Sequence, residues 1–189
     1  SPKRISLGIL RGPLTRYVIS VSTPTLGLVS LFIAIYQVGR EDPVLGAIYF
    51  IAIQVIQIAA SIALGELYDR LGMKAIYIYY PLVPMVALGF AINQLFFLLI
   101  GVVLAIEDSI QRAVVGDLAR GREAIAYGYY HLVYGLASVV GGYIVGYLAE
   151  HKMIPYLLAI SIALSAFGAL TLTSIKTEKP SEGKKALNI

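Results

Sequence analysis

Six apolar stretches, each close to the length that crosses a lipid bilayer, constrain this chain more than any other feature of its sequence. A membrane-spanning α-helix needs about 20 predominantly apolar residues. The stretches cover residues 17–38, 43–64, 75–92, 95–115, 126–148 and 154–175. With a mean hydropathy of +0.79 and 58% hydrophobic residues, the chain has too much apolar surface for one water-soluble core of this size. The sequence therefore predicts an all-α membrane protein whose six transmembrane helices form a bundle over residues 17–175.

Lysine and arginine lie almost entirely on one side of this six-span arrangement. Outside the spans, only Arg40 and Lys152 lie on the opposite side. Short loops rich in lysine and arginine stay in the cytoplasm. Residues 1–16 are therefore predicted to be a cytoplasmic lead-in, and residues 176–189 a disordered cytoplasmic tail, of a multi-pass protein of the plasma membrane. Because the net charge of +4 arises beside the spans, it reports this topology, and no nucleic-acid partner is expected.

The fourth apolar stretch carries four polar side chains near its middle, namely Glu107, Asp108, Gln111 and Arg112. Each ionised group there costs about 2.5 to 3.5 kcal/mol on insertion scales. In an α-helix the four lie within an arc of about 140°, with Asp108 and Arg112 one turn apart. They either line a water-accessible pathway for a substrate and a proton or cation, or include an Asp108–Arg112 pair that only locks the bundle. Glu107 is the stronger candidate for ion coupling, because that pair leaves it without a partner.

Two glutamines of the second stretch, Gln54 and Gln57, lie near the middle of the membrane on one side of the predicted helix. They either face the same pathway as the polar groups of the fourth stretch or make hydrogen bonds between helices, which is common for glutamine in membrane bundles.

No catalytic motif accompanies these polar groups. The sequence contains no H-E-x-x-H, no G-x-S-x-G and no Walker lysine loop. Cysteine is absent, and the two histidines, His131 and His151, fall at opposite membrane faces of the predicted bundle. We therefore expect a protein that is not an enzyme, with no catalytic residue, no cofactor and no metal ion.

The fifth stretch has a face of small residues that includes Gly135, Gly142 and Gly146 and ends in a G-x-x-x-G pattern. Small residues let the backbones of membrane helices approach closely. This face is predicted to be a helix-packing seam, and the absence of large side chains would also let helices slide along it.

The segment from residue 65 to residue 74, G-E-L-Y-D-R-L-G-M-K, joins the second and third stretches on the predicted cytoplasmic side. It resembles the short cytoplasmic hairpin of major facilitator superfamily (MFS) transporters, whose pattern is roughly G-x-L-A-D-R-x-G-R-K. The sequence departs from that pattern at Tyr68 and Met73. The matching residues are Gly65, Leu67, Asp69, Arg70, Gly72 and Lys74. Residues 111–118 and 126–148 are also similar to the C-terminal half of prokaryotic permeases of this superfamily.

The resemblance implies one six-helix half, the C-terminal one, of a twelve-helix transporter fold. The N-terminal half would be a missing portion or a second chain. The resemblance also implies that Asp69 and Arg70 hold a cytoplasmic gate, while Glu107 and Arg112 border a central cavity.

The implied function is secondary active transport by alternating access. We expect proton-coupled export of small organic compounds, as in multidrug efflux antiporters. Two alternatives remain open at this point. One is a permease for uptake of a sugar or metabolite, and the other is a non-transporting membrane scaffold that assembles through the small-residue face of the fifth stretch.

Overall fold

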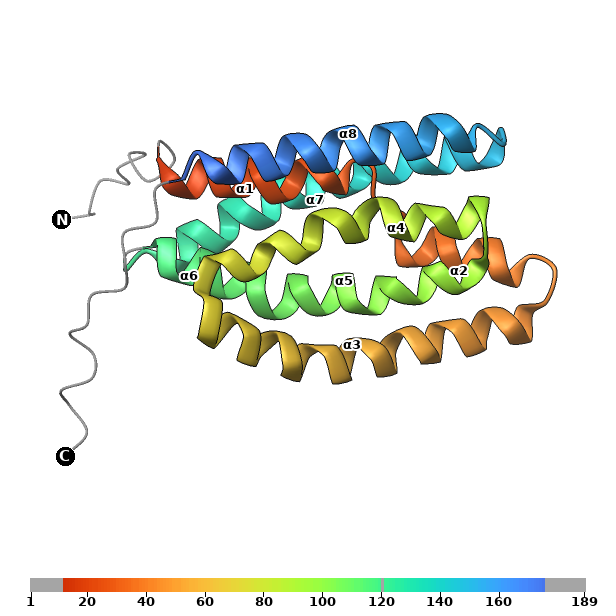
Figure 1. Ribbon diagram of the computed structural model, residues 1–189, viewed down its shortest axis with the longest axis horizontal. Helices are drawn as coiled ribbons and strands as arrows, with labels where there is room; N and C mark the ends of the chain where they lie inside the picture. Colours follow the sequence, from red (N-terminus) through yellow and green to blue (C-terminus); the bar gives the residue numbers. More distant parts are fainter. Residues whose placement is uncertain (1–11, 120, 176–189) are drawn as a thin grey trace.

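The computed structural model describes residues 12–119 and 121–175, and over these residues the regular structure is entirely helical (Figure 1). The predicted lead-in and tail lie mostly outside the described residues, apart from residues 12–16, of which 13–16 already belong to the first helix. The elements are α1 (Pro13–Thr25), α2 (Leu31–Gly39), α3 (Pro43–Leu71), the 3-10 segment η2 (Gly72–Ile78), α4 (Tyr79–Ala91), the 3-10 segment η3 (Gln94–Leu99), α5 (Ile100–Ile106), the π-helical segment η4 (Glu107–Gln111), α6 (Arg112–Ala119), α7 (Glu123–Glu150) and α8 (Ile154–Thr173).

Among the described residues, four helical segments are long and apolar enough to cross a membrane: Pro43–Ala91, Gln94–Ala119, Glu123–Glu150 and Ile154–Thr173. The prediction of an all-helical protein of membrane type is therefore confirmed. The first of the four has 49 residues, which as one straight helix would measure about 74 Å, more than twice the hydrocarbon thickness of a bilayer. The chain instead turns back at Gly72, and α3 and α4 run in opposite directions (Figure 1).

The first predicted span, residues 17–38, is two helices separated by a break at residues 26–30. Pro24 lies inside the last turn of α1, where it removes a backbone donor. Ser30 then caps α2 by accepting from the Ile33 amide. The broken backbone is enclosed by protein, because the Ser161 hydroxyl of α8 donates to the Gly27 carbonyl over 2.6 Å. Irregular backbone at membrane depth is tolerated in that situation.

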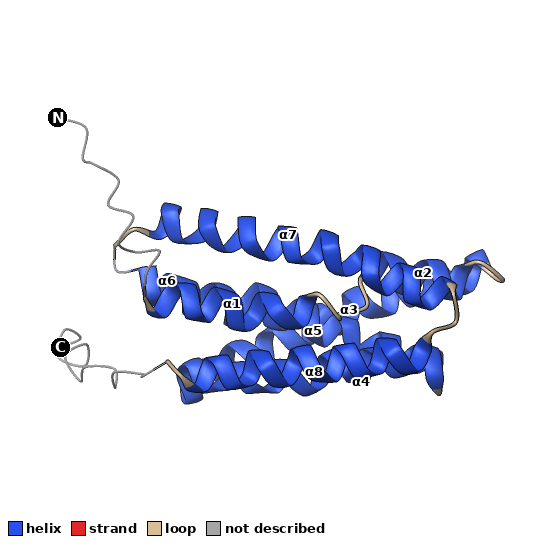
Figure 2. Cartoon of the chain, turned by 90° about the horizontal axis from the view of Figure 1, so that it is seen from above, coloured by secondary structure: helices blue, strands red, loops and turns tan. Residues whose placement is uncertain are grey.

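Helix α1 is largely buried, and it lies between α7 and α8 (Figure 2). Glycines of both neighbours bring their backbones against it. A Cβ atom on Gly141 of α7 would lie 2.5 Å from the Thr25 carbonyl oxygen, and one on Gly168 of α8 would lie 2.5 Å from the Ser20 carbonyl oxygen. Only glycine permits these two approaches.

The second predicted span continues further than expected. Helix α3 runs through the charged segment to Leu71, so Gly65, Asp69 and Arg70 are helical and only Gly72 makes the turn, with a φ of 58°. The helix thus extends seven residues beyond the predicted span of residues 43–64, because no residue between Gly65 and Leu71 interrupts the helical hydrogen bonds. The fourth predicted span, residues 95–115, extends to Ala119 as the continuous rod η3–α5–η4–α6.

Candidate functional site

The four polar residues of the fourth predicted span lie on and just after a π-helical turn, Glu107–Gln111. Single π turns inside α-helices are rare and occur frequently at functional sites. The wider turn changes the direction of the side chains, so the 140° arc that was calculated for a regular α-helix does not apply. The polar groups divide instead into two sets, one directed toward α7 and one directed toward α3.

Glu107 belongs to the set that is directed toward α7. Its side chain is half-buried, and the Tyr134 hydroxyl donates a hydrogen bond to Glu107 Oε1. Within residues 12–119 and 121–175, no lysine, arginine or histidine lies within ion-pair distance of this carboxylate. Glu107 therefore depends on a neutral hydroxyl for its interaction with the protein.

Gln111 continues this contact one turn further along. Its side chain is fully buried, and Oε1 accepts from the Tyr130 hydroxyl over 2.7 Å. A third tyrosine, Tyr127, donates to the Arg112 carbonyl over 2.9 Å. We refer to Tyr127, Tyr130 and Tyr134 as the tyrosine ladder, because they lie along α7 and bind three successive levels of the rod.

The tyrosine ladder is closely fitted to the rod. The rings of Tyr130 and Tyr134 have centroids 5.5 Å apart, and a Cβ atom on Gly116 would lie 3.1 Å from the Tyr127 hydroxyl. These contacts hold the π turn against α7. The buried Nε2 of Gln111 is a donor without an acceptor among the described residues.

Asp108 and Arg112 form the second set, together with Gln57 of α3. Arg112 pairs with Asp108 Oδ1 at 2.9 Å, and both side chains are about half exposed. The other carboxylate oxygen of Asp108 accepts from Gln57 Nε2 over 2.7 Å. The expected Asp108–Arg112 contact is therefore present, and Gln57 is the glutamine that joins it. Gln54 is half-buried nearby on α3 and makes no hydrogen bond with the described residues.

The residues of the hairpin motif do not form one cluster. Arg70 pairs with Glu66 one turn earlier on α3, whereas Asp69 and Lys74 are exposed and have no partner within the part of the chain that the structure describes. The contact between helix ends is made by Tyr68, where the sequence departs from the superfamily pattern. Its hydroxyl donates to Asp117 Oδ2 of α6 over 2.6 Å.

The small-residue face of α7 is not the face that packs closely within this chain. Cβ atoms on Gly135 and Gly142 would meet no atom within 4 Å, and one on Gly146 would meet only the end of Ile33 at 4.0 Å. The close packing is at Gly141, which the sequence analysis did not select. No described residue packs closely on the Gly135–Gly142–Gly146 face.

The tyrosine ladder is not among the site residues expected from the sequence, because tyrosines at the end of a membrane helix are ordinarily interfacial anchors. Their spacing of three and four residues places them on one helical face, opposite a stretch with polar groups at similar intervals. That coincidence was the available signal.

Chemically, the Glu107 carboxylate and its Tyr134 hydroxyl can hold a proton, and the half-exposed Asp108–Arg112 pair can contact a small polar or charged group. Within the described residues, no three histidine, aspartate or glutamate side chains gather in a way that could hold a metal ion. Comparisons of this chain with models of protein families, with curated proteins and with solved structures gave no match.

Proposed function

We propose that this protein is one six-helix half of an MFS-type secondary active transporter of the plasma membrane, and that it exports small organic compounds by alternating access in exchange for protons. In this proposal the break between α1 and α2 lies within one span, α3 and α4 are separate spans, and both termini are cytoplasmic. The substrate pathway passes between this half and a second six-helix half.

The observation that carries the proposal is the environment of Glu107. This carboxylate lies in the middle of a rod of membrane length, on a π turn, with a tyrosine hydroxyl as its partner and no cation within ion-pair distance among the described residues. Leaving an ionised group unpaired at this depth costs several kcal/mol. Such groups in membrane proteins are usually parts of ion or proton pathways, and a purely structural glutamate would be expected to have a cationic partner.

Asp108 and Arg112 supply the second part of the argument. They are neutralised as a pair and yet about half exposed, so the pair faces an open side of the bundle. A site between two helical bodies would use this side, with Glu107 exchanging the ion and the pair forming part of the substrate surface.

Helices α3 and α7 also expose continuous apolar rows, on the faces turned away from Gln57 and from the tyrosine ladder, and in a membrane protein such rows meet lipid or another helical body. The row on α3 has the spacing of four and three residues that is typical of helix-to-helix seams, and its members are between 54% and 76% exposed. They are Val44, Ile48, Ile51, Val55, Ile58 and Ile62. The row on α7 has the same spacing and consists of Leu132, Leu136, Val139 and Tyr143.

The test is transport into proteoliposomes driven by an imposed pH gradient, with a panel of lipophilic cations and of sugars. The chain is assayed alone and joined to a second six-helix half. Glu107→Gln keeps the size of the side chain and its ability to accept from Tyr134, and we expect it to abolish gradient-driven transport while the protein remains folded. The matched control is Glu150→Gln, at the exposed end of α7, which should transport normally.

The outcome distinguishes ion coupling by Glu107, uptake of a sugar or metabolite, and a non-transporting scaffold. Gradient-driven transport that survives Glu107→Gln would exclude the coupling role. Transport of sugars in the uptake direction would favour a metabolite permease. A folded protein that transports nothing across the panel, with or without the second half, would favour the scaffold, for which the open glycine face of α7 provides a surface.

A further inference from the structure

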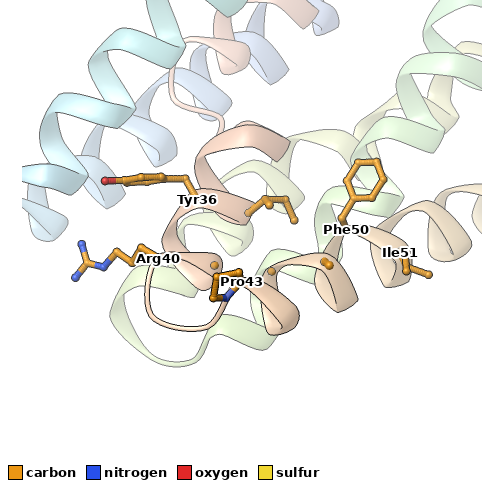
Figure 3. Close-up of a pocket in the computed structure, with 9 residues that line it drawn as sticks. Tyr36, Arg40, Pro43, Phe50 and Ile51 are labelled. Atoms are coloured by element: carbon orange, nitrogen blue, oxygen red, sulfur yellow. The ribbon is translucent and has the colours of Figure 1, made fainter.

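An apolar groove lies between the end of α2 and the start of α3, with a volume of about 580 Å³ (Figure 3). Figure 3 shows Arg40 and Pro43 at one end of the groove and Phe50 and Ile51 further along α3. Most lining side chains are apolar, and Arg40 is the one charged residue among those that line it. The groove is separate from the polar groups near Glu107.

The helices meet closely at the base of the groove. A Cβ atom on Gly46 would lie 2.8 Å from the Cα of Gly39, so the two backbones touch there and no side chain fills the space beside them. Ala47 adds only a methyl group to the wall. The result is a shallow apolar channel rather than an enclosed cavity.

The dimensions of the groove match one leaflet of a membrane. Residues 43–51 of α3 span about 12 Å along the helix, close to the roughly 15 Å of hydrocarbon in a single leaflet. The loop at residues 40–42 ends both helices, which places it at the boundary between hydrocarbon and water. A phospholipid has its phosphate at that boundary and its acyl chains directly below.

The charges at the mouth of the groove restrict the head group. Arg40 is exposed and forms no ion pair with the described residues. Asp42 is occupied as the cap of α3, since its Oδ1 accepts from the Val44 and Leu45 amides. Glu41 is also exposed, so the mouth of the groove carries one arginine, Arg40, and two acidic residues, Glu41 and Asp42. This combination suits a head group that carries both a phosphate and an ammonium, and it disfavours one with net negative charge.

We infer that the groove binds one zwitterionic phospholipid, with an acyl chain along Ala47 and Phe50 and the phosphate on the Arg40 guanidinium. An arginine side chain can offer two parallel N–H donors to a phosphate. A free phosphate ion would make no use of the apolar walls, so the combination of arginine and groove selects a lipid. The inference holds whether or not the chain transports a substrate.

The experiment is native mass spectrometry of the whole chain in detergent with added phosphatidylethanolamine or phosphatidylglycerol. Arg40→Gln removes the phosphate contact, and we expect the affinity of the phosphatidylethanolamine adduct to fall about tenfold, as for loss of a hydrogen bond to a charged group. Lys152→Gln, which removes a cation from another loop, is the control for charge and should retain the adduct.

A second pair of variants tests the groove itself. Ala47→Phe fills the channel from an exposed position, whereas Ala63→Phe adds the same bulk to an exposed position elsewhere on α3. We expect only the first to lose the adduct. Equal binding of phosphatidylglycerol would overturn the assignment of the head group, and an unchanged adduct in both Arg40→Gln and Ala47→Phe would overturn the site.

A photoreactive benzoylphenylalanine in place of Phe50, an aromatic residue that already lines the groove, distinguishes the occupant in native membranes. Capture of a phospholipid supports the inference. Capture of a polypeptide, either a second copy of the chain or another helical body, would overturn it, because the groove would then belong to a protein interface.

Discussion

At the scale of single residues, the environment of Glu107 is decided by tyrosines rather than by opposite charge. Tyr134 donates to its carboxylate, and Tyr130 makes the corresponding contact with Gln111 one turn away. A hydroxyl can orient a carboxylate without neutralising its charge. The carboxylate can then still bind a proton or another cation. A lysine in place of Tyr134 would satisfy the carboxylate permanently.

Tyr134→Phe should weaken the protein and its activity together. Removing a hydrogen bond to a charged group inside a membrane bundle is expected to lower the free energy of unfolding by about 1 to 2 kcal/mol. Unfolding in mixed micelles with increasing dodecyl sulfate, followed by circular dichroism, measures this change. Tyr143→Phe on the exposed side of α7 is the control, and equal stability of the two variants would argue against the ladder contact.

The candidate site could be predicted from the sequence in its residues but not in its geometry. Polar groups in an apolar stretch are conspicuous, so Glu107, Asp108, Gln111, Arg112 and Gln57 were all identified. The π turn could not be predicted, because it depends on contacts with α7 that lie outside the local sequence. The division of the polar groups into two sets follows from that turn.

At the scale of elements, α7 packs on α1 through the face of α7 that carries Gly141. The regular spacing of Gly135, Gly142 and Gly146 favours that row as the seam, yet the row is open among the described residues. A single buried glycine beside the row makes the close contact instead. Spacing identifies a face of small residues, but it does not identify which neighbour the helix meets.

Gly141→Ala and Gly142→Ala should therefore behave differently although the residues are adjacent. The added methyl group at position 141 would lie 2.5 Å from the Thr25 carbonyl oxygen and 2.7 Å from the Leu26 Cα, both backbone atoms, and the overpacking is expected to cost about 1 to 3 kcal/mol. At position 142 nothing lies within 4 Å, and the helix should gain slightly. Unfolding midpoints of the two variants in the same detergent measure the difference, and equal midpoints would contradict this packing.

At the scale of the whole molecule, the apolar pattern predicted the helical elements well and the connections less well. The boundaries of the last two predicted spans differ from α7 and α8 by three residues or fewer at each end. The first span is not a single helix, because Pro24 and the residues after it form a break in which the Gly27 carbonyl accepts from Ser161 of α8. Because this hydrogen bond comes from a helix more than a hundred residues away in the sequence, the hydropathy pattern cannot predict it.

The proposed six-span topology can be tested directly, because the sequence has no cysteine. Single cysteines at Glu41 and His151 should react with a membrane-impermeant maleimide added outside intact cells. Cysteines at Asp69 and Glu123 should react only after the membrane is opened. All four positions are exposed, so access to the reagent depends on the side of the membrane. Labelling of Asp69→Cys from outside would exclude the topology in which α3 and α4 are two separate spans with their connection in the cytoplasm.

The break between α1 and α2 also determines how the molecule would respond to a mechanical load. Helix α1 is held between α7 and α8 by backbone contacts at Gly141 and Gly168, whereas α2 packs mainly on α3. Residues 26–30 join these two bodies without a continuous row of helical hydrogen bonds. Tension applied to the chain would therefore extend this short connection first. α1 would be extracted from the bundle in one step, and α2 would follow with α3 in another.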